Sequence, residues 1–201
     1  GGPGWIREFG SGTPVPADGP ITAVDHVNLS QPWQHFDEAV LFYESTLGLT
    51  PRPSVEVPSP MGLVRSQVMR SSDGAVRMAL NIAPMVFDGD GSGYPQHVAF
   101  ACSALVTLAR TAVARGLQFL PVPGNYYEDL DARFGLDPKF LAVLKDLNLL
   151  YDRDADGEFL HFYTSTVGNV FFEVVERRPA YEGYGAPNAP VRLAAQYLAN
   201  G

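Results

Sequence analysis

Two histidines and one glutamate, far apart in the chain, are the side chains best suited to do chemistry together. His26, His97 and Glu173 lie in the runs VDHVNL, PQHVAF and VFFEVVER. Each run is rich in β-branched or aromatic residues, which favour strands. Two imidazoles and one carboxylate are the ligand set of an open non-haem Fe(II) site, which leaves coordination positions free for substrate and O₂. The three residues therefore predict a metal site built on strands.

The spacing of these residues predicts a duplicated unit. The intervals 26–97 and 97–173 are nearly equal, as expected if a repeated strand–helix–strand unit builds one site between its two copies. Residue periodicity and turn signals predict for the first copy strands at 21–29, 63–71 and 75–83 and a helix at 33–46. They predict for the second copy strands at 96–102, 158–166 and 169–177, helices at 104–115, 125–134 and 138–147, and a closing helix at 188–199.

These elements predict an α+β protein. Two βαβββ modules are expected to form a curled, mostly antiparallel open barrel around the metal site, with a C-terminal helix that caps it. The predicted units are a linker or arm at 1–20, a first module at 21–88, a second module at 89–182 with a helical insertion at 121–157, and a lid helix at 183–201. Gly183, Gly185 and Pro187 suit a flexible lid, and ordinary loop chemistry explains them equally well.

The bulk composition narrows the class of protein. With 201 residues, 46% hydrophobic and 18% charged, the chain is expected to be globular. A net charge of −8 without a basic stripe argues against nucleic acid, and no apolar run approaches the roughly 20 residues that span a membrane. A single cysteine, Cys102, cannot form an internal disulfide, which suits the cytoplasm. Gly1 in place of Met suggests a fragment, and a homo-oligomer stays open.

Several phrases of the chain resemble the catalytic C-terminal half of 4-hydroxyphenylpyruvate dioxygenase, in the vicinal oxygen chelate superfamily. They are FYESTLGL at 42–49, PGNYYEDLDARF at 123–134, LNLLYDRDADGEFLHFYTSTVGNVFFEVVERR at 147–178 and GYGAPNAPVRLAAQ at 183–196. The resemblance implies that His26, His97 and Glu173 hold Fe(II). Mg, Mn, Co or Zn could also occupy such a site, because nitrogen and oxygen ligands accept several divalent ions.

The same resemblance assigns residues to the substrate. Tyr163 and Phe172 are expected to line an aromatic pocket, Asn188 to lie in the gating tail, and Asn28 to contact the substrate. His161 falls where the dioxygenase usually has a glutamine that faces the substrate, so we assign it a catalytic role. Strand alternation places it on the face of Tyr163. Substrate contact and a structural role both stay open, because its direction depends on strand register.

The resemblance implies one leading function and two rivals. The leading function is oxidation of an aromatic 2-oxo acid similar to 4-hydroxyphenylpyruvate with O₂, by oxidative decarboxylation and ring hydroxylation. The phrases LHFYT and NAPVRLAAQ are also similar to the dioxygenase-like module fused to a bacterial 3-dehydroshikimate dehydratase of quinate breakdown. A ligand-binding member of the superfamily that needs no metal is the third alternative, and the complete ligand trio counts against it.

Overall fold

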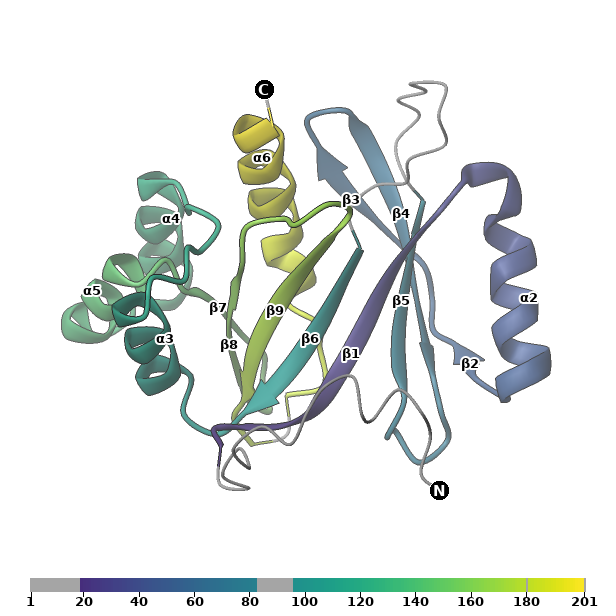
Figure 1. The fold of residues 1–201 in the computed structure, drawn as a ribbon, viewed down its shortest axis with the longest axis horizontal. Coiled ribbons are helices and arrows are strands. Elements are labelled where there is room, and N and C mark those ends of the chain that lie inside the picture. Colours follow the sequence, from purple (N-terminus) through teal and green to yellow (C-terminus); the bar gives the residue numbers. More distant parts are fainter. Residues whose placement is uncertain (1–18, 83–95, 180, 201) are drawn as a thin grey trace, which may run out of the picture.

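One mixed sheet organises the molecule. The computed structural model describes residues 19–82, 96–179 and 181–200, and Figure 1 shows their strands curling into a half-barrel with helices on both flanks. The order across the sheet is β2–β4–β5–β1–β6–β9–β8–β7, and β3 pairs with β4 outside this path. The strands are β1 Ile21–Gln31, β2 Thr50–Pro51, β3 Val55–Ser59, β4 Gly62–Arg70, β5 Arg77–Ile82, β6 Gln96–Cys102, β7 Leu150–Arg153, β8 Glu158–Tyr163 and β9 Val170–Arg177.

The helices follow local sequence signals. Helix α2 ends at Gly48, which takes a left-handed conformation with φ 63° and donates its N–H to the Glu44 carbonyl. Helix α5 begins after Asp137, whose carboxylate accepts the backbone N–H groups of Lys139 and Phe140. The helical segments are η1 Trp33–His35, α2 Phe36–Leu47, α3 Leu105–Ala114, α4 Gly124–Phe134, α5 Pro138–Asp146, η2 Ala186–Asn188 and α6 Ala189–Asn200.

The predicted fold class is confirmed. Among the described strands, the pairings β1–β5 and β6–β9 are parallel, and the other six are antiparallel. Strand β6 has the bounds expected from the sequence, and the other expected strands and helices differ from the prediction by a few residues. Residues 1–18 of the predicted arm, and the module boundary predicted at residues 88 and 89, lie outside the described residues.

Three short strands are missing from the sequence-based prediction. Strand β2 has two residues and β7 has four, which is too short for an alternating pattern to emerge. Strand β3 contains Pro58, and a proline lowers the strand signal except at an edge. Strand β3 does lie at an edge, because it pairs only with β4 among the described strands. Strands β3 and β7 complete the βαβββ order of the two halves, and β2 is an additional two-residue strand in the first half.

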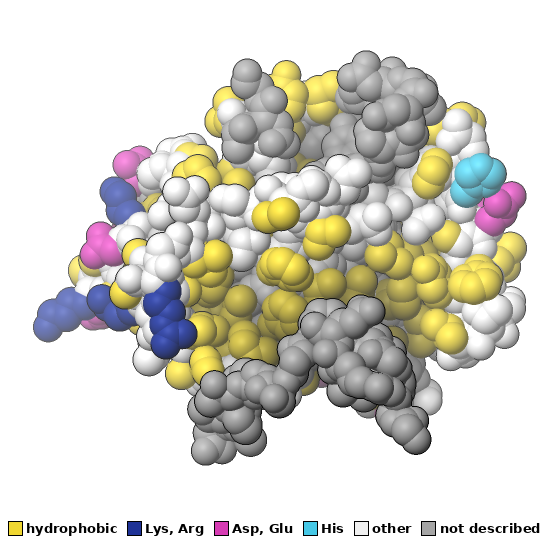
Figure 2. All heavy atoms as spheres, in the orientation of Figure 1, with side chains coloured by type: hydrophobic (Ala, Val, Ile, Leu, Met, Phe, Trp, Pro, Cys, Tyr) yellow, Lys and Arg dark blue, Asp and Glu magenta, His cyan; other side chains and the backbone are white. Residues whose placement is uncertain are grey.

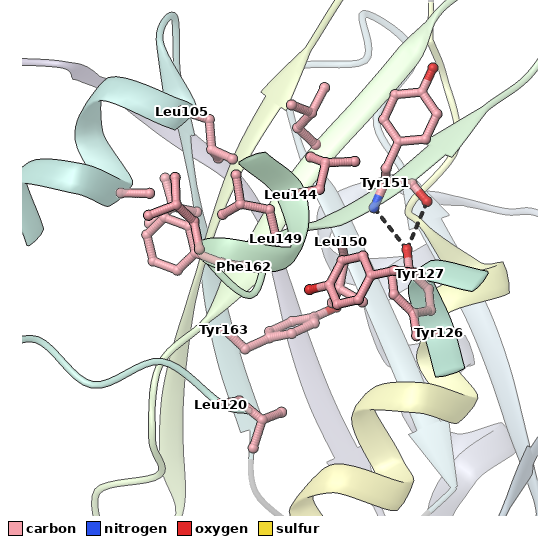
Figure 3. Close-up of a cluster of buried hydrophobic side chains, with 14 of the residues drawn as sticks. Leu105, Leu120, Tyr126, Tyr127, Leu144, Leu149, Leu150, Tyr151, Phe162 and Tyr163 are labelled. Carbon is pink, nitrogen blue, oxygen red and sulfur yellow. Dashed lines mark hydrogen bonds between the residues drawn. The ribbon is translucent and has the colours of Figure 1, made fainter. Parts of the chain in front are cut away.

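The largest core lies under helices α3, α4 and α5, against strands β7, β8 and β9. Figure 3 shows Leu144, Leu149 and Phe162 among its buried side chains. Tyr126 ties α4 to this core, since its hydroxyl accepts the Tyr151 N–H at 2.9 Å and lies 3.0 Å from the Tyr151 carbonyl. A smaller core under α2 contains Phe36, Leu49, Met69 and Leu80. Figure 2 shows apolar side chains also gathered over the middle of the face that Figure 1 presents.

Candidate metal centre and cavity

The three predicted ligands come from three adjacent strands. His26 lies on β1, His97 on β6 and Glu173 on β9, and these strands are neighbours in the middle of the sheet (Figure 1). In the strand register Ala99 pairs with both His26 and Glu173, so these two ligands and Ala99 form one row across the sheet, and His97 lies two residues before Ala99 on β6. The small Ala99 side chain leaves the space in which the longer side chains on either side of it meet.

The ligand atoms converge tightly. Glu173 Oε2 lies 3.2 Å from His26 Nε2 and 3.2 Å from His97 Nε2, and one ligand atom from each residue lies within 4.8 Å of the others. A divalent ion with bonds of about 2.0–2.2 Å to nitrogen and oxygen holds neighbouring ligands about 3 Å apart. All three side chains are buried, with 1–4% of their surface exposed. The donor set and its spacing therefore fit a metal ion.

Burial and mutual charge set the protonation of this trio. Burial is the largest influence on His26, but the Glu173 charge and the Asp25 hydrogen bond outweigh it and raise the His26 pKa to about 9. Burial dominates at His97 and lowers its pKa to about 4. Burial would raise the pKa of Glu173, but its histidine neighbours hold that pKa well below its usual range. A proton and a metal ion thus compete for the Nε2 atom of His26, which faces Glu173.

A hydrogen-bonded pair orients His26 from behind. Asp25 Oδ1 lies 2.8 Å from His26 Nδ1, so Nδ1 carries the proton in the metal-binding tautomer and Nε2 faces the carboxylate of Glu173. Arg177 in turn binds Asp25 with two parallel hydrogen bonds, Nε to Oδ2 at 2.7 Å and Nη2 to Oδ1 at 2.8 Å. Nδ1 of His97 is buried without a hydrogen-bond partner among the described residues.

A second chain of hydrogen bonds orients Glu173. His161 Nδ1 lies 2.7 Å from Glu173 Oε1, and His161 Nε2 lies 2.9 Å from Asn188 Nδ2. Asn188 Nδ2 also donates to the Tyr151 carbonyl at 3.1 Å, and the Tyr126 hydroxyl lies 3.0 Å from Asn188 Oδ1. The Asn188 amide group is therefore the donor to His161 Nε2. His161 must carry its proton on Nδ1 and donate it to Glu173.

This geometry places two of the residues that the resemblance assigned to the reaction. His161 is fully buried and is not among the residues that line the cavity. Of the two roles left open for it, its contact with Glu173 favours the structural one, and a catalytic role stays a prediction. Asn188 is also fully buried and outside the cavity lining. It does lie in the expected tail, but its contacts are with His161, Tyr126 and Tyr151. Substrate contact is therefore excluded for its amide group in this arrangement.

A cavity of about 270 Å³ opens beside the three ligands. Asn28 and Tyr163, two of the residues that the resemblance assigned to the substrate, line it. Phe172 does not, because it follows Phe171 on β9 and points to the opposite side of the sheet, where it is 41% exposed and its ring lies 5.8 Å from that of Phe100. Phe171 is the buried ring of this strand, and it packs 4.7 Å from the His97 ring.

Tyr184 and Arg192 are two of the cavity residues that the sequence-based set lacks. Tyr184 lies in the tail with its ring 5.6 Å from that of His26, and its buried hydroxyl has no partner among the described residues. Arg192 lies on α6 and is 8% exposed. A sequence signal for Arg192 existed: Asn188, Arg192 and Gln196 are polar residues spaced by four, which places them on one side of a helix, and all three are buried.

Comparison with known proteins decides the family. Residues 23–157, more than half of the chain, match the family described as the Glyoxalase/Bleomycin resistance protein/Dioxygenase superfamily. The chain belongs to this superfamily. The membership confirms the superfamily expected from the sequence. Within the described part of the chain, no helix of this superfamily member is long and apolar enough to cross a membrane.

Relatives within the superfamily are longer than this chain. A Pseudomonas aeruginosa protein named 3-dehydroshikimate dehydratase is 43% identical over 185 residues, which cover 87% of this chain and 29% of the relative. A Yarrowia lipolytica 4-hydroxyphenylpyruvate dioxygenase is 30% identical over 210 residues, which cover 92% of this chain and 52% of the relative. The chain thus spans about a third to a half of these relatives.

A solved structure shares the fold over most of the chain. It is described as a xylose isomerase-like TIM barrel/4-hydroxyphenylpyruvate dioxygenase fusion protein, and it aligns with a TM-score of 0.77 and 36% identity. The alignment covers 91% of this chain and 30% of that protein. The chain is therefore similar to one part of a larger fusion.

Proposed function

We propose that this chain is the metal-binding catalytic module of a dioxygenase-type enzyme, in which His26, His97 and Glu173 hold a divalent ion such as Fe(II). The observation that carries the proposal is the position of Glu173 Oε2, 3.2 Å from both histidine Nε2 atoms at the wall of a cavity. When bound, such an ion supplies a Lewis acid with positions free for substrate oxygens and O₂.

The protein's own residues prepare this site for the ion and its ligand. Asp25 and His161 hold His26 and Glu173 in fixed orientations, which reduces the reorganisation needed on binding. Asn28 and Tyr163 present polar groups to the cavity. Valine side chains from β3 and β4 give the cavity an apolar part of its lining, namely Val55, Val57, Val64 and Val68.

Two substrates are favoured by different observations. An aromatic 2-oxo acid similar to 4-hydroxyphenylpyruvate is supported by the relatives named for that dioxygenase and by the Fe(II)-type ligand set. A role as the dioxygenase-like part of a 3-dehydroshikimate dehydratase is supported by the 43% identity to the Pseudomonas aeruginosa relative and by the barrel fusion structure. In that second case the ligand is 3-dehydroshikimate or a compound made from it.

Metal analysis of ligand variants tests the proposal. The chain is loaded anaerobically with Fe(II), and bound iron is measured for the wild type, His97→Ala, Glu173→Ala and the control His35→Ala. His35 is exposed and pairs with Glu38 across one helical turn. We expect one iron per chain in the wild type and the control, and none in the two ligand variants, all with unchanged circular dichroism. Full iron content in His97→Ala refutes the assignment.

Oxygen uptake then separates the two substrates. The iron-loaded chain is mixed with 4-hydroxyphenylpyruvate or with 3-dehydroshikimate in an oxygen electrode. Uptake with the first compound supports the dioxygenase alternative. Binding of the second compound without oxygen uptake supports the dehydratase alternative. Binding of neither compound to the iron-loaded protein counts against both substrates.

A further inference from the structure

A buried cation without a carboxylate partner faces the same cavity as the metal ligands. Arg192 is 8% exposed, and its Nη1 donates to Gln196 Oε1 at 2.8 Å. No carboxylate of the described residues lies within 4.0 Å of its guanidinium group. Arg177 shows the usual arrangement for a mostly buried arginine, with two hydrogen bonds to Asp25. A buried charge without a counter-charge is costly. This indicates that an anionic ligand supplies the counter-charge of the Arg192 guanidinium group.

The position of Arg192 limits how large that ligand is. Its guanidinium carbon lies 5.6 Å from the centre of the Phe171 ring and 5.7 Å from the centre of the Tyr163 ring. The Phe171 ring lies 4.7 Å from the His97 ring. A single aromatic ring thus packs against both the cation and a metal ligand. A molecule the size of one substituted six-membered ring spans the same interval, and the cavity volume of about 270 Å³ suits it.

The charges that face the cavity also constrain the ligand. Glu173 contributes one negative charge and Arg192 one positive charge, while the single carboxylate of Asp25 pairs with Arg177 at 2.7 Å and with Arg77 at 3.8 Å. Histidines bind metals as neutral imidazoles, so a divalent ion leaves the groups around the cavity with a net charge of about +2 or more. A ligand with a negative charge at each end lowers this net charge. The exposed Arg52 at the cavity lining adds a further positive charge.

We propose, building on the proposed function, that the cavity takes a compact ring carboxylic acid with two adjacent oxygen atoms. Its oxygen pair binds the metal held by His26, His97 and Glu173, and its separate carboxylate binds the Arg192 guanidinium. An arylpyruvate matches this cavity less well. Its carboxylate and keto oxygens both bind the metal, and the neutral phenol at its far end leaves Arg192 without an anion.

Three small probes test the two contacts separately. They are 3,4-dihydroxybenzoate, which has both the oxygen pair and the carboxylate; 3,4-dihydroxybenzamide, which keeps the oxygen pair and the shape without the charge; and benzoate, which has the carboxylate alone. The chain is loaded anaerobically with Co²⁺, which nitrogen and oxygen ligands accept. Calorimetry gives each Kd, and the visible spectrum of Co²⁺ reports direct binding of oxygen to the metal.

The expected result is a preference that depends on Arg192. In the wild type, 3,4-dihydroxybenzoate binds about 10- to 100-fold more tightly than the amide, the range for a hydrogen bond to a charged group, and both change the Co²⁺ spectrum. In Arg192→Met the ratio of the two Kd values, amide over acid, falls to about one. The amide keeps its affinity in this variant and so reports an intact site. Arg192→Lys keeps part of this ratio. Arg110→Gln, a control at an exposed arginine on α3 outside the cavity lining, keeps all of it.

Several outcomes would overturn the inference, each distinct from a failure of the proposed function. A wild-type ratio near one refutes it without any variant. So does an Arg192→Met protein that keeps the full ratio, or benzoate binding as tightly as 3,4-dihydroxybenzoate. If the proposed function is wrong, no probe changes the Co²⁺ spectrum, and Glu173→Ala binds the probes like the wild type.

Discussion

Metal binding to this chain should release one proton and should tighten as the pH rises. The pKa of about 9 means that His26 carries an extra proton at neutral pH in the metal-free protein, and the pKa of about 4 means that His97 does not. Because the metal must displace the His26 proton, its affinity should increase about tenfold per pH unit below pH 9. Between pH 6 and pH 8 the expected gain is about 100-fold, and above pH 9 the affinity should level off.

Calorimetry measures both quantities. Zn²⁺ or Co²⁺ is titrated into the metal-free chain at pH 6, 7 and 8, each in two buffers with different ionisation enthalpies. The dependence of the measured heat on buffer gives the number of protons released, and the Kd values give the slope with pH. Release of two protons at pH 7 would mean that both histidines are charged, and release of none would mean that neither is. Either result refutes the reasoning.

Asp25 supplies the matched perturbation. Its carboxylate helps to raise the His26 pKa, so Asp25→Asn should lower that pKa and reduce proton release at pH 8 below one. Loss of such a partner typically weakens metal affinity 10- to 100-fold. The exposed pair of His35 and Glu38 offers the control, and His35→Asn should leave both the affinity and the proton count unchanged.

Three further predictions concern residues around the ligands. His161→Gln should keep the metal, because an amide group can still accept from the Asn188 amide and donate to Glu173, whereas His161→Phe should weaken metal affinity about 10- to 100-fold in the same titration. Gly185 has φ +61°, and an added Cβ would lie 2.8 Å from Phe159 and 3.1 Å from His161. Gly185→Ala should therefore lower the free energy of unfolding by about 2 kcal/mol and the Tm by roughly 4–8 °C. An unchanged Tm contradicts this. Ala79→Glu should keep metal binding but abolish the Co²⁺ spectral change with 3,4-dihydroxybenzamide, and a retained spectral change would exclude a fourth ligand at this position.

The convergence of His26, His97 and Glu173 was predictable because strands have a strong local sequence signal. Each of the three residues lies in a run of β-branched and aromatic residues, and each run is a strand in the structure. The alternation of side chains along β9 was already sufficient to show that Phe172 does not line the cavity. Since side chains alternate across a strand, an inward Glu173 requires Phe171 to point inward and Phe172 to point outward. The error at Phe172 came from family resemblance overriding a simple geometric rule.

The contacts made by the neighbours of these residues were harder to predict from the sequence. The contact of His161 with Glu173 depends on the pairing of β8 with β9, in which Tyr163 lies opposite Glu173 and His161 lies opposite Val175. Nothing local sets that register, since a shift of one residue would turn His161 to the other face. The position of Arg192 at the cavity depends in the same way on how helix α6 packs against the sheet. Figure 1 shows this helix, far along the chain, packed near β3 of the first half.

Ala79 explains why two similar modules build one open site. Strands β1 and β6 pair antiparallel, with His26 opposite Ala99 and Asn28 opposite His97, so a local twofold relation exchanges the two histidines. Ala99 pairs in parallel with Glu173, and the equivalent Asn28 pairs in parallel with Ala79. Ala79 is therefore the counterpart of the ligand Glu173, and it lines the cavity. A carboxylate there would complete two histidines and two carboxylates around the ion, whereas a methyl group keeps that side free for the oxygen atoms of a substrate.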